Sequence, residues 1–146
     1  MATEPTGAAE IPRDLTDLDF SAWPNFSRAE LACRGSGECR MDPGFMGRLQ
    51  NLRVAFGKPL RVTSGYRSPA HNAAVSGTGE AGPHTTGRAV DIAIGGPDVW
   101  RLVQLAQDWG FTGIGLRQAG PMEGRYVHLD DLPPSGAHPR PRVWTY

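Results

Sequence analysis

The chain has 146 residues, and its 15 Lys and Arg residues balance 15 Asp and Glu residues, so its formal net charge at pH 7 is zero. This length suits one domain with a core of its own. A neutral chain without a basic run is poorly suited to binding nucleic acid or an anionic membrane. No apolar stretch approaches the roughly 20 residues that span a bilayer, so we expect no membrane insertion.

Residues 1–19 are rich in Pro, Thr, Ala and acidic residues and have little periodicity. They predict a loose N-terminal arm before a single domain over residues 20–146. The first residues lack the basic and apolar regions of a secretory signal, so we expect synthesis in the cytoplasm.

Two segments have the apolar spacing of amphipathic helices, residues 41–57 and residues 96–110. The inward stripes are Phe45, Leu49, Leu52 and Phe56 in the first, and Val99, Leu102, Val103 and Ala106 in the second. Ser27 and Glu30 have the spacing of a capping box, which predicts that a shorter helix begins here, before the two longer ones. The only cysteines, Cys33 and Cys39, are either two thiols in a loop or a small loop-closing disulfide.

Short runs of β-type residues follow the first long helix. They are residues 59–64, 87–94, 113–116, 125–130 and 142–146, with a turn and a short helix predicted over residues 68–75. Because no βαβ alternation is sustained, we predict an α+β fold, with a small antiparallel sheet flanked by helices.

Two of these strands carry polar side chains opposite an aliphatic face. Asp91 alternates with Val90 and Ile92, and His128 shares one face with Tyr126 and Asp130. A further histidine, His84, lies in the loop before the first of these strands. Two imidazoles and one carboxylate are a frequent ligand set of catalytic zinc. The alternative is that these side chains have only structural roles.

The motif PHTTGRAVD, followed by YVHLD, resembles the D-alanyl-D-alanine carboxypeptidase-like family of zinc peptidases. These enzymes cleave peptidoglycan peptides and share a fold with hedgehog domains. The motif residues of this family correspond to His84, Gly87, Ala89, Asp91 and His128. The resemblance therefore implies a Zn²⁺ cofactor held by His84, Asp91 and His128. A chain turning through Gly87 would bring Asp91 back to the metal.

The segment SGYRSPAHN is similar to the family segment upstream of the first ligand. The resemblance implies that Arg67 binds a carboxylate or carbonyl of the substrate, and it places Ser64 and Tyr66 at the substrate as well.

The general base is the departure from the family pattern. Many members carry a carboxylate three residues before the second histidine, where this chain has Arg125, which cannot accept a proton. Asp130 or Glu123 could take that role, or Asp130 could orient an imidazole. Tyr126 could polarise the carbonyl or simply pack.

Structural or surface roles are expected for three other polar residues. We expect His71 to brace its loop, and His138 and Arg88 to be solvent-facing.

The predicted function is a zinc-dependent peptidase that cleaves a peptidoglycan stem or cross-link next to a D-amino acid. The absence of a signal in the sequence favours a phage or prophage lysis enzyme, or a tail-associated enzyme with a phage tail or assembly partner, which acts on the cell wall after release. The alternative, which Arg125 supports, is a zinc-binding structural or recognition module without turnover.

Overall fold

Five strands form one mixed sheet in the order β1-β2-β4-β3-β5. The computed structural model describes residues 19–146, so the predicted N-terminal arm lies outside the described residues except for Asp19. The strands are β1 (Arg61–Ser64), β2 (Ala89–Ala93), β3 (Gly113–Arg117), β4 (Tyr126–Asp130) and β5 (Arg142–Thr145). The α-helices are α1 (Arg28–Leu31), α2 (Pro43–Phe56), α3 (Pro69–Val75) and α4 (Pro97–Asp108). Short 3-10 turns are η2 (Phe20–Ala22), η3 (Gly79–Ala81), η4 (Pro83–Thr86) and η5 (Met122–Gly124).

The predicted α+β fold is confirmed. All neighbouring strands are antiparallel except β3 and β5, which are parallel. The sheet is therefore mixed, and the sequence did not predict the parallel pair. β3 and β5 are separated by β4 and a long loop, which gives the chain enough length to return in the same direction.

The helix boundaries follow from local capping. The Asp42 side chain accepts a hydrogen bond from the backbone N–H of Phe45 at 2.8 Å, Pro43 occupies the first turn, and Gly57 ends α2 with φ 78°. The capping box of Ser27 and Glu30 is present at α1. These contacts satisfy backbone N–H groups that the first turn of a helix leaves without partners.

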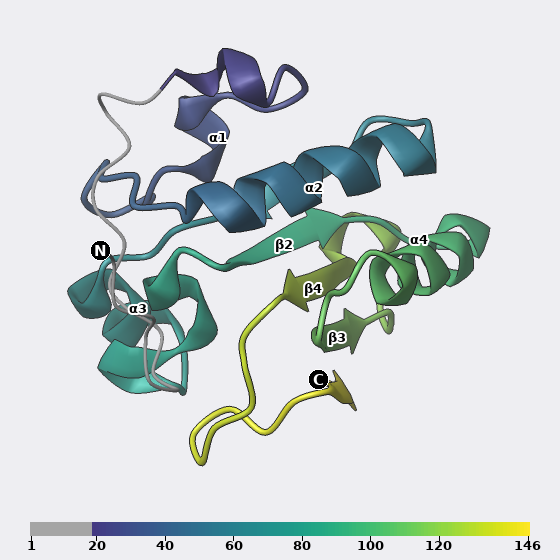
Figure 1. Ribbon diagram of the computed structural model, residues 1–146. Helices are drawn as coiled ribbons and strands as arrows, with labels where there is room; N and C mark the ends of the chain where they lie inside the picture. The colour runs from purple at the N-terminus through teal and green to yellow at the C-terminus, as the bar shows by residue number, and fades with distance from the viewer. Residues whose placement is uncertain (1–18) are drawn as a thin grey trace.

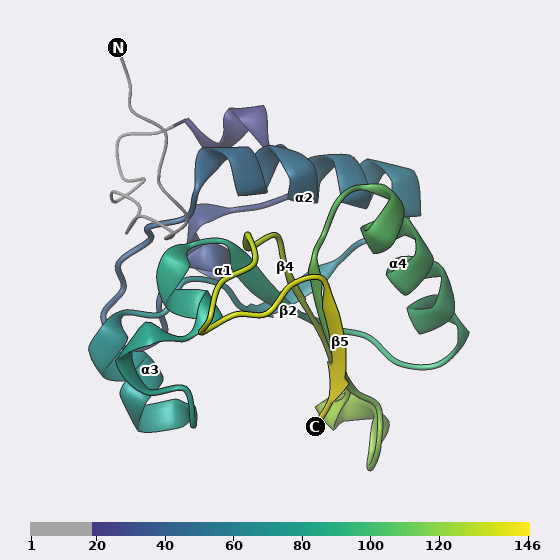
Figure 2. The same cartoon turned by 60° about the horizontal axis from the view of Figure 1, so that its bottom comes forward.

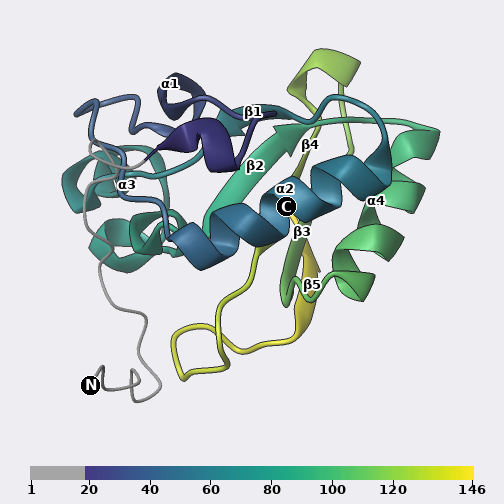
Figure 3. The same ribbon diagram turned by 45° about the horizontal axis from the view of Figure 1, so that its top comes forward.

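One face of the sheet is covered and forms the core. Helix α2 crosses the sheet with α4 beside it (Figures 1 and 3). The fully buried side chains include Phe45, Leu49, Leu52, Val90, Ile92, Leu102, Val127 and Leu129. Cys33 and Cys39 are buried in this core as thiols.

The end of the chain lies on the other face of the sheet. The segment after β4 forms a long loop near α3 and returns as β5 (Figure 2). No helix within residues 19–146 is both long and apolar enough to cross a membrane.

The register of the sheet aligns the polar side chains of this second face. Asp91 of β2 is paired with His128 of β4, and His128 is in turn paired with Gly115 of β3. One step along the same face, Asp130 is paired with Gly113. Because cross-strand partners point to the same side of a sheet, the polar residues of β2 and β4 meet above its centre.

Candidate metal centre

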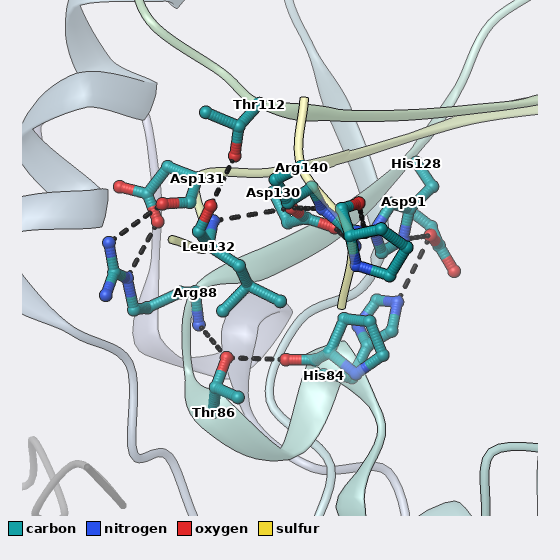
Figure 4. Close-up of polar contacts among 12 residues, drawn as sticks. His84, Thr86, Arg88, Asp91, Thr112, His128, Asp130, Asp131, Leu132 and Arg140 are labelled. Carbon is teal, nitrogen blue, oxygen red and sulfur yellow. Dashed lines mark hydrogen bonds and ion pairs between the residues drawn. The ribbon is translucent and has the colours of Figure 1, made fainter. Parts of the chain in front are cut away.

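Three side chains from two strands and one turn converge above the sheet. Asp91 and His128 are cross-strand neighbours, and His84 comes from η4 (Figure 4). Gly87 has a φ of 73° at the end of η4, a backbone conformation that residues with a Cβ rarely adopt. This turn leads the chain from His84 into β2, as the sequence motif predicted.

The ligand atoms of these three side chains face one another. Nε2 of His84 lies 3.2 Å from Oδ1 of Asp91, and Nδ1 of His128 lies 3.1 Å from the same oxygen. The three candidate ligand atoms all lie within 4.8 Å of one another, and all three side chains are buried. This spacing fits a single metal ion bound by the three residues.

The other nitrogen of each imidazole is already occupied. Nδ1 of His84 lies 2.7 Å from the carbonyl oxygen of Gly65, and Nε2 of His128 lies 2.7 Å from Oδ2 of Asp130. Each of these nitrogens must carry a proton to donate to its oxygen, so in a neutral ring the opposite nitrogen presents a lone pair. Two lone pairs and a carboxylate oxygen then point at one another, an arrangement that a cation bound between them would stabilise.

The Asp91 carboxylate is ionised in this environment. Burial by itself raises the pKa of a carboxyl group, but it is outweighed by the positive charge that His84 and His128 carry in their protonated forms and by the hydrogen bonds that these forms donate. Together they hold the pKa of Asp91 well below its usual range.

Arg67 lies beside this cluster, next to Asp91, and two uncharged side chains also accept hydrogen bonds from its guanidinium. Its Nη2 lies 3.5 Å from Oδ2 of Asp91, while its Nε donates to Oγ of Ser64 and its Nη1 to Oδ1 of Asn72, both at 3.1 Å. Asn72 is fully buried and donates to Oγ1 of Thr78. The sequence predicted only that Asn72 braces its loop together with His71, and it did not predict the contact with Arg67.

Ser64 and Tyr66, which the resemblance implied at the substrate, lie outside the cleft. Ser64 supports Arg67 through the hydrogen bond to its Nε, and Tyr66 is 3% exposed within the core. Neither residue lines the cleft at the metal centre. Of the three residues assigned to substrate binding, the structure puts Arg67 alone on the cleft wall.

The metal centre forms the floor of a cleft of about 640 Å³. Its walls come from the η3–η4 region, from Arg67 and Tyr126, and from the end of the chain, whose lining residues are Ala137, His138, Arg140, Arg142, Trp144 and Tyr146. Tyr126 therefore reaches the cleft. Burial and the charge of Asp91 raise the pKa of its hydroxyl, so this group is protonated and can donate a hydrogen bond.

Asp130 is enclosed and does not line the cleft. Its carboxylate accepts hydrogen bonds from Nε2 of His128 and from Nε and Nη2 of Arg140, all between 2.7 and 2.8 Å. Burial by itself raises the pKa of this carboxyl group. The hydrogen bonds from Arg140 and His128 lower it by more, so the pKa of Asp130 lies well below its usual range. This environment favours the orienting role among the two roles that the sequence left open for Asp130.

Glu123 and Arg125 lie away from the cleft. Glu123 is exposed in η5, and Nε of Arg125 donates to the carbonyl of Gly120 at 3.0 Å. Among the described lining residues, Asp91 is the only carboxylate.

Two residues that the sequence predicted to face solvent, Arg88 and His138, take part in an ion pair and in the cleft wall. Arg88 donates from Nε to Oδ1 of Asp131 and from Nη2 to the Asp131 carbonyl, both at 2.8 Å. His138 lines the cleft. Both side chains are half-buried, and their contacts were not predicted because residues 131–141 have no periodicity from which a fold-back onto the sheet could be inferred.

The imidazole of His138 is uncharged at neutral pH. Burial and the charge of Arg140 lower its pKa, and the opposing effect of Asp130 is smaller. An uncharged imidazole with one nitrogen donating can accept a proton at the other.

Gly113 gives Asp130 the room that it occupies, because a Cβ at position 113 would overlap the Asp130 carboxylate. Gly113→Ala is expected to lower stability by about 1–3 kcal/mol, the usual cost of overpacking, and to weaken zinc binding. Thermal unfolding and zinc titration would measure both effects. Gly47→Ala in α2, where a Cβ meets nothing within 4 Å, is the control and is expected to stabilise by about 0.5–1 kcal/mol. Wild-type stability and zinc affinity in Gly113→Ala would contradict this account.

Comparison with known proteins gives one match. The sequence model of the Peptidase M15 family matches residues 24–130. No curated protein and no solved structure matches the chain. The matched range includes His84, Asp91, His128 and Arg67, and it ends at Asp130.

Proposed function

Since this chain belongs to the Peptidase M15 family, whose members are in general zinc-dependent, we propose that it hydrolyses a peptide bond in peptidoglycan stems or cross-links. The resemblance to D-alanyl-D-alanine carboxypeptidases supports a bond next to a D-amino acid in this proposal. The observation that carries the proposal is the convergence of Nε2 of His84, Nδ1 of His128 and Oδ1 of Asp91 at the floor of a cleft.

His84, Asp91 and His128 would hold the zinc ion. Zinc bound by three protein ligands supplies a Lewis acid for the scissile carbonyl and lowers the pKa of water to about 7. Two neutral imidazoles and one carboxylate leave a net positive charge at such a site, which suits a carbonyl that becomes negative during the reaction.

Arg67 and Tyr126 bind the substrate in this proposal. The guanidinium of Arg67 is fixed by Ser64 and Asn72, and such a planar group can bind a carboxylate through two parallel hydrogen bonds. Tyr126 has a protonated hydroxyl in the cleft and can donate to the scissile carbonyl.

His138 accepts the proton of the attacking water in this proposal. A proton acceptor must reach the cleft and be in its deprotonated form at the working pH. His138 meets both conditions, whereas Asp130 is enclosed and Glu123 lies outside the cleft. The assignment replaces the two carboxylates that the sequence offered for this role.

Defined muropeptides test the function directly. Purified protein is expected to release new products that mass spectrometry identifies, to lose this activity with a chelator and to regain it with zinc. The same peptides with an L-residue beside the scissile bond are the control. Zinc binding without cleavage of any muropeptide would favour the alternative, a zinc-binding module without turnover. A role in phage lysis or in a phage tail is part of the proposal and requires that the protein added from outside also cleave intact cell walls.

Arg67→Lys is expected to lower kcat/KM by about tenfold or more, because a hydrogen bond to a charged group contributes about 1.5–3 kcal/mol and lysine offers only a point charge. Steady-state kinetics would measure the change, and zinc content should stay the same. Arg61→Lys, on the exposed side of the same strand β1, is the control. Normal kinetics in Arg67→Lys would leave Arg67 with a structural role only.

A further inference from the structure

The end of the chain lies outside the family match and yet encloses the metal centre. The match ends at residue 130, whereas Arg140, Arg142, Trp144 and Tyr146 all line the cleft. The Trp144 ring lies 5.2 Å from the His128 ring, centroid to centroid. The segment after β4 therefore covers a candidate metal ligand directly.

Arg140 makes the strongest polar contact of this segment. Its Nε donates to Oδ1 of Asp130 at 2.8 Å, and its Nη2 donates to Oδ2 at 2.7 Å (Figure 4). The side chains of Arg140 and Asp130 are 3% and 0% exposed. A buried guanidinium that holds both oxygens of one carboxylate is a strong and directional interaction. The Trp144 ring covers the guanidinium, with Cζ of Arg140 5.1 Å from the ring centre.

The same carboxylate is the partner of His128. Oδ2 of Asp130 lies 2.7 Å from Nε2 of His128, so one oxygen is shared between the arginine and the imidazole. Nδ1 of that imidazole is the atom that faces Asp91. The position of the Asp130 carboxylate therefore fixes both the tautomer and the orientation of the His128 imidazole.

Asp130 is closely surrounded in its present position. Gly113 lies against its carboxylate on one side, and the backbone N–H of Leu132 contacts Oδ1 at 3.4 Å. Among the residues that the structure describes, Arg140 is the arginine or lysine that forms an ion pair with Asp130. Without Arg140 the buried carboxylate would lose its compensating charge, a strongly unfavourable change that displacement of the carboxylate would relieve.

We propose that Arg140 is a positioning residue of the metal centre, which fixes His128 through Asp130 and thereby sets the affinity for zinc. The proposal rests on the proposed function, since it concerns the same metal. It extends the functional unit beyond the part of the chain that the family match covers.

Zinc affinity tests this role without reference to catalysis. In competition with a chromogenic chelator, Arg140→Gln is expected to bind zinc about 10–100-fold more weakly than the wild type, the usual effect of removing a partner of a ligand. Arg140→Lys keeps the charge but loses the two-pronged contact, so a smaller loss is expected. If Arg140→Gln does not fold, Arg140→Lys decides the question, and wild-type affinity in that variant would overturn the proposal.

Arg88→Gln is the matched control. Arg88 also forms a close ion pair with a buried carboxylate, that of Asp131, but neither residue contacts a candidate ligand in the described hydrogen bonds. Its removal is expected to lower stability and to leave zinc affinity unchanged. An equal loss of affinity in Arg88→Gln and Arg140→Gln would show a general effect of destabilisation and would overturn the positioning role.

A double variant tests the route through Asp130. If Arg140 acts through this carboxylate, Arg140→Gln is expected to weaken zinc binding much less in the background of Asp130→Asn than in the wild type. Fully additive effects would overturn the proposal. A wild-type protein that binds no zinc would instead contradict the proposed function, so the two failures are distinguishable.

Discussion

His84→Ala and His128→Ala are each expected to abolish tight zinc binding and to reduce peptidase activity to background. Each substitution removes one of the two imidazole nitrogens that face Oδ1 of Asp91, and so leaves two of the three ligands. The loss of affinity should exceed the roughly 10–100-fold change that follows removal of a ligand's hydrogen-bond partner. Metal analysis of protein purified without added zinc measures the stoichiometry, which is expected to be one per chain in the wild type.

His71→Ala is the control for these two variants. His71 lies in α3, where its backbone N–H is capped by Oγ of Ser68, and its side chain does not line the cleft. This variant is therefore expected to retain one zinc ion. Unchanged zinc stoichiometry in both His84→Ala and His128→Ala would show that the three converging side chains do not form the metal site.

His138→Gln is expected to lower kcat by roughly 10²–10⁴-fold and to leave zinc content unchanged, because general base catalysis commonly contributes that much. The imidazole must be uncharged to accept a proton, so kcat/KM is expected to fall as the pH drops through the pKa of His138. Since burial and Arg140 lower that pKa, the fall should lie below the ordinary imidazole value of about 6.5. A complete pH profile of both proteins measures it.

Chemical rescue and two carboxylate variants complete this test. Added imidazole is expected to restore part of the activity of His138→Ala. Glu123→Gln should behave as the wild type, since Glu123 is exposed outside the cleft. Asp130→Asn is expected to lower kcat by on the order of 10² through the loss of His128 orientation, together with weaker zinc binding. A strong loss of kcat in Glu123→Gln with normal kcat in His138→Gln would assign the base to η5.

The position of Arg125 outside the cleft explains why this residue does not exclude catalysis. Arg125 stands at the position where many relatives carry a carboxylate, but its guanidinium donates to Gly120 and is not among the residues that line the cleft. It therefore leaves the role of proton acceptor to another lining residue. In the sequence, Arg125 supported only the alternative of a module without turnover, because the candidate proton acceptors, Asp130 and Glu123, lie close to His128 along the chain.

The sequence by itself determined the elements and the set of candidate ligands. Strand alternation placed Asp91 and His128 opposite aliphatic residues, and the strands and helices lie where periodicity and capping predicted them. The motif from His84 to Asp91 predicted the turn at Gly87. These are local properties, since a period of two or of 3.6 residues and a capping side chain are set by residues close in the chain.

The tertiary structure alone decided which side chains complete the site. Arg140 reaches Asp130, and His138 reaches the cleft, from an irregular loop whose path depends on β5 pairing with β3. Tyr66 shows the opposite case, since it packs in the core and does not line the cleft. A loop without periodicity carries no pattern that states where its side chains will point, because long-range pairing and burial fix their positions only when the whole sheet has formed.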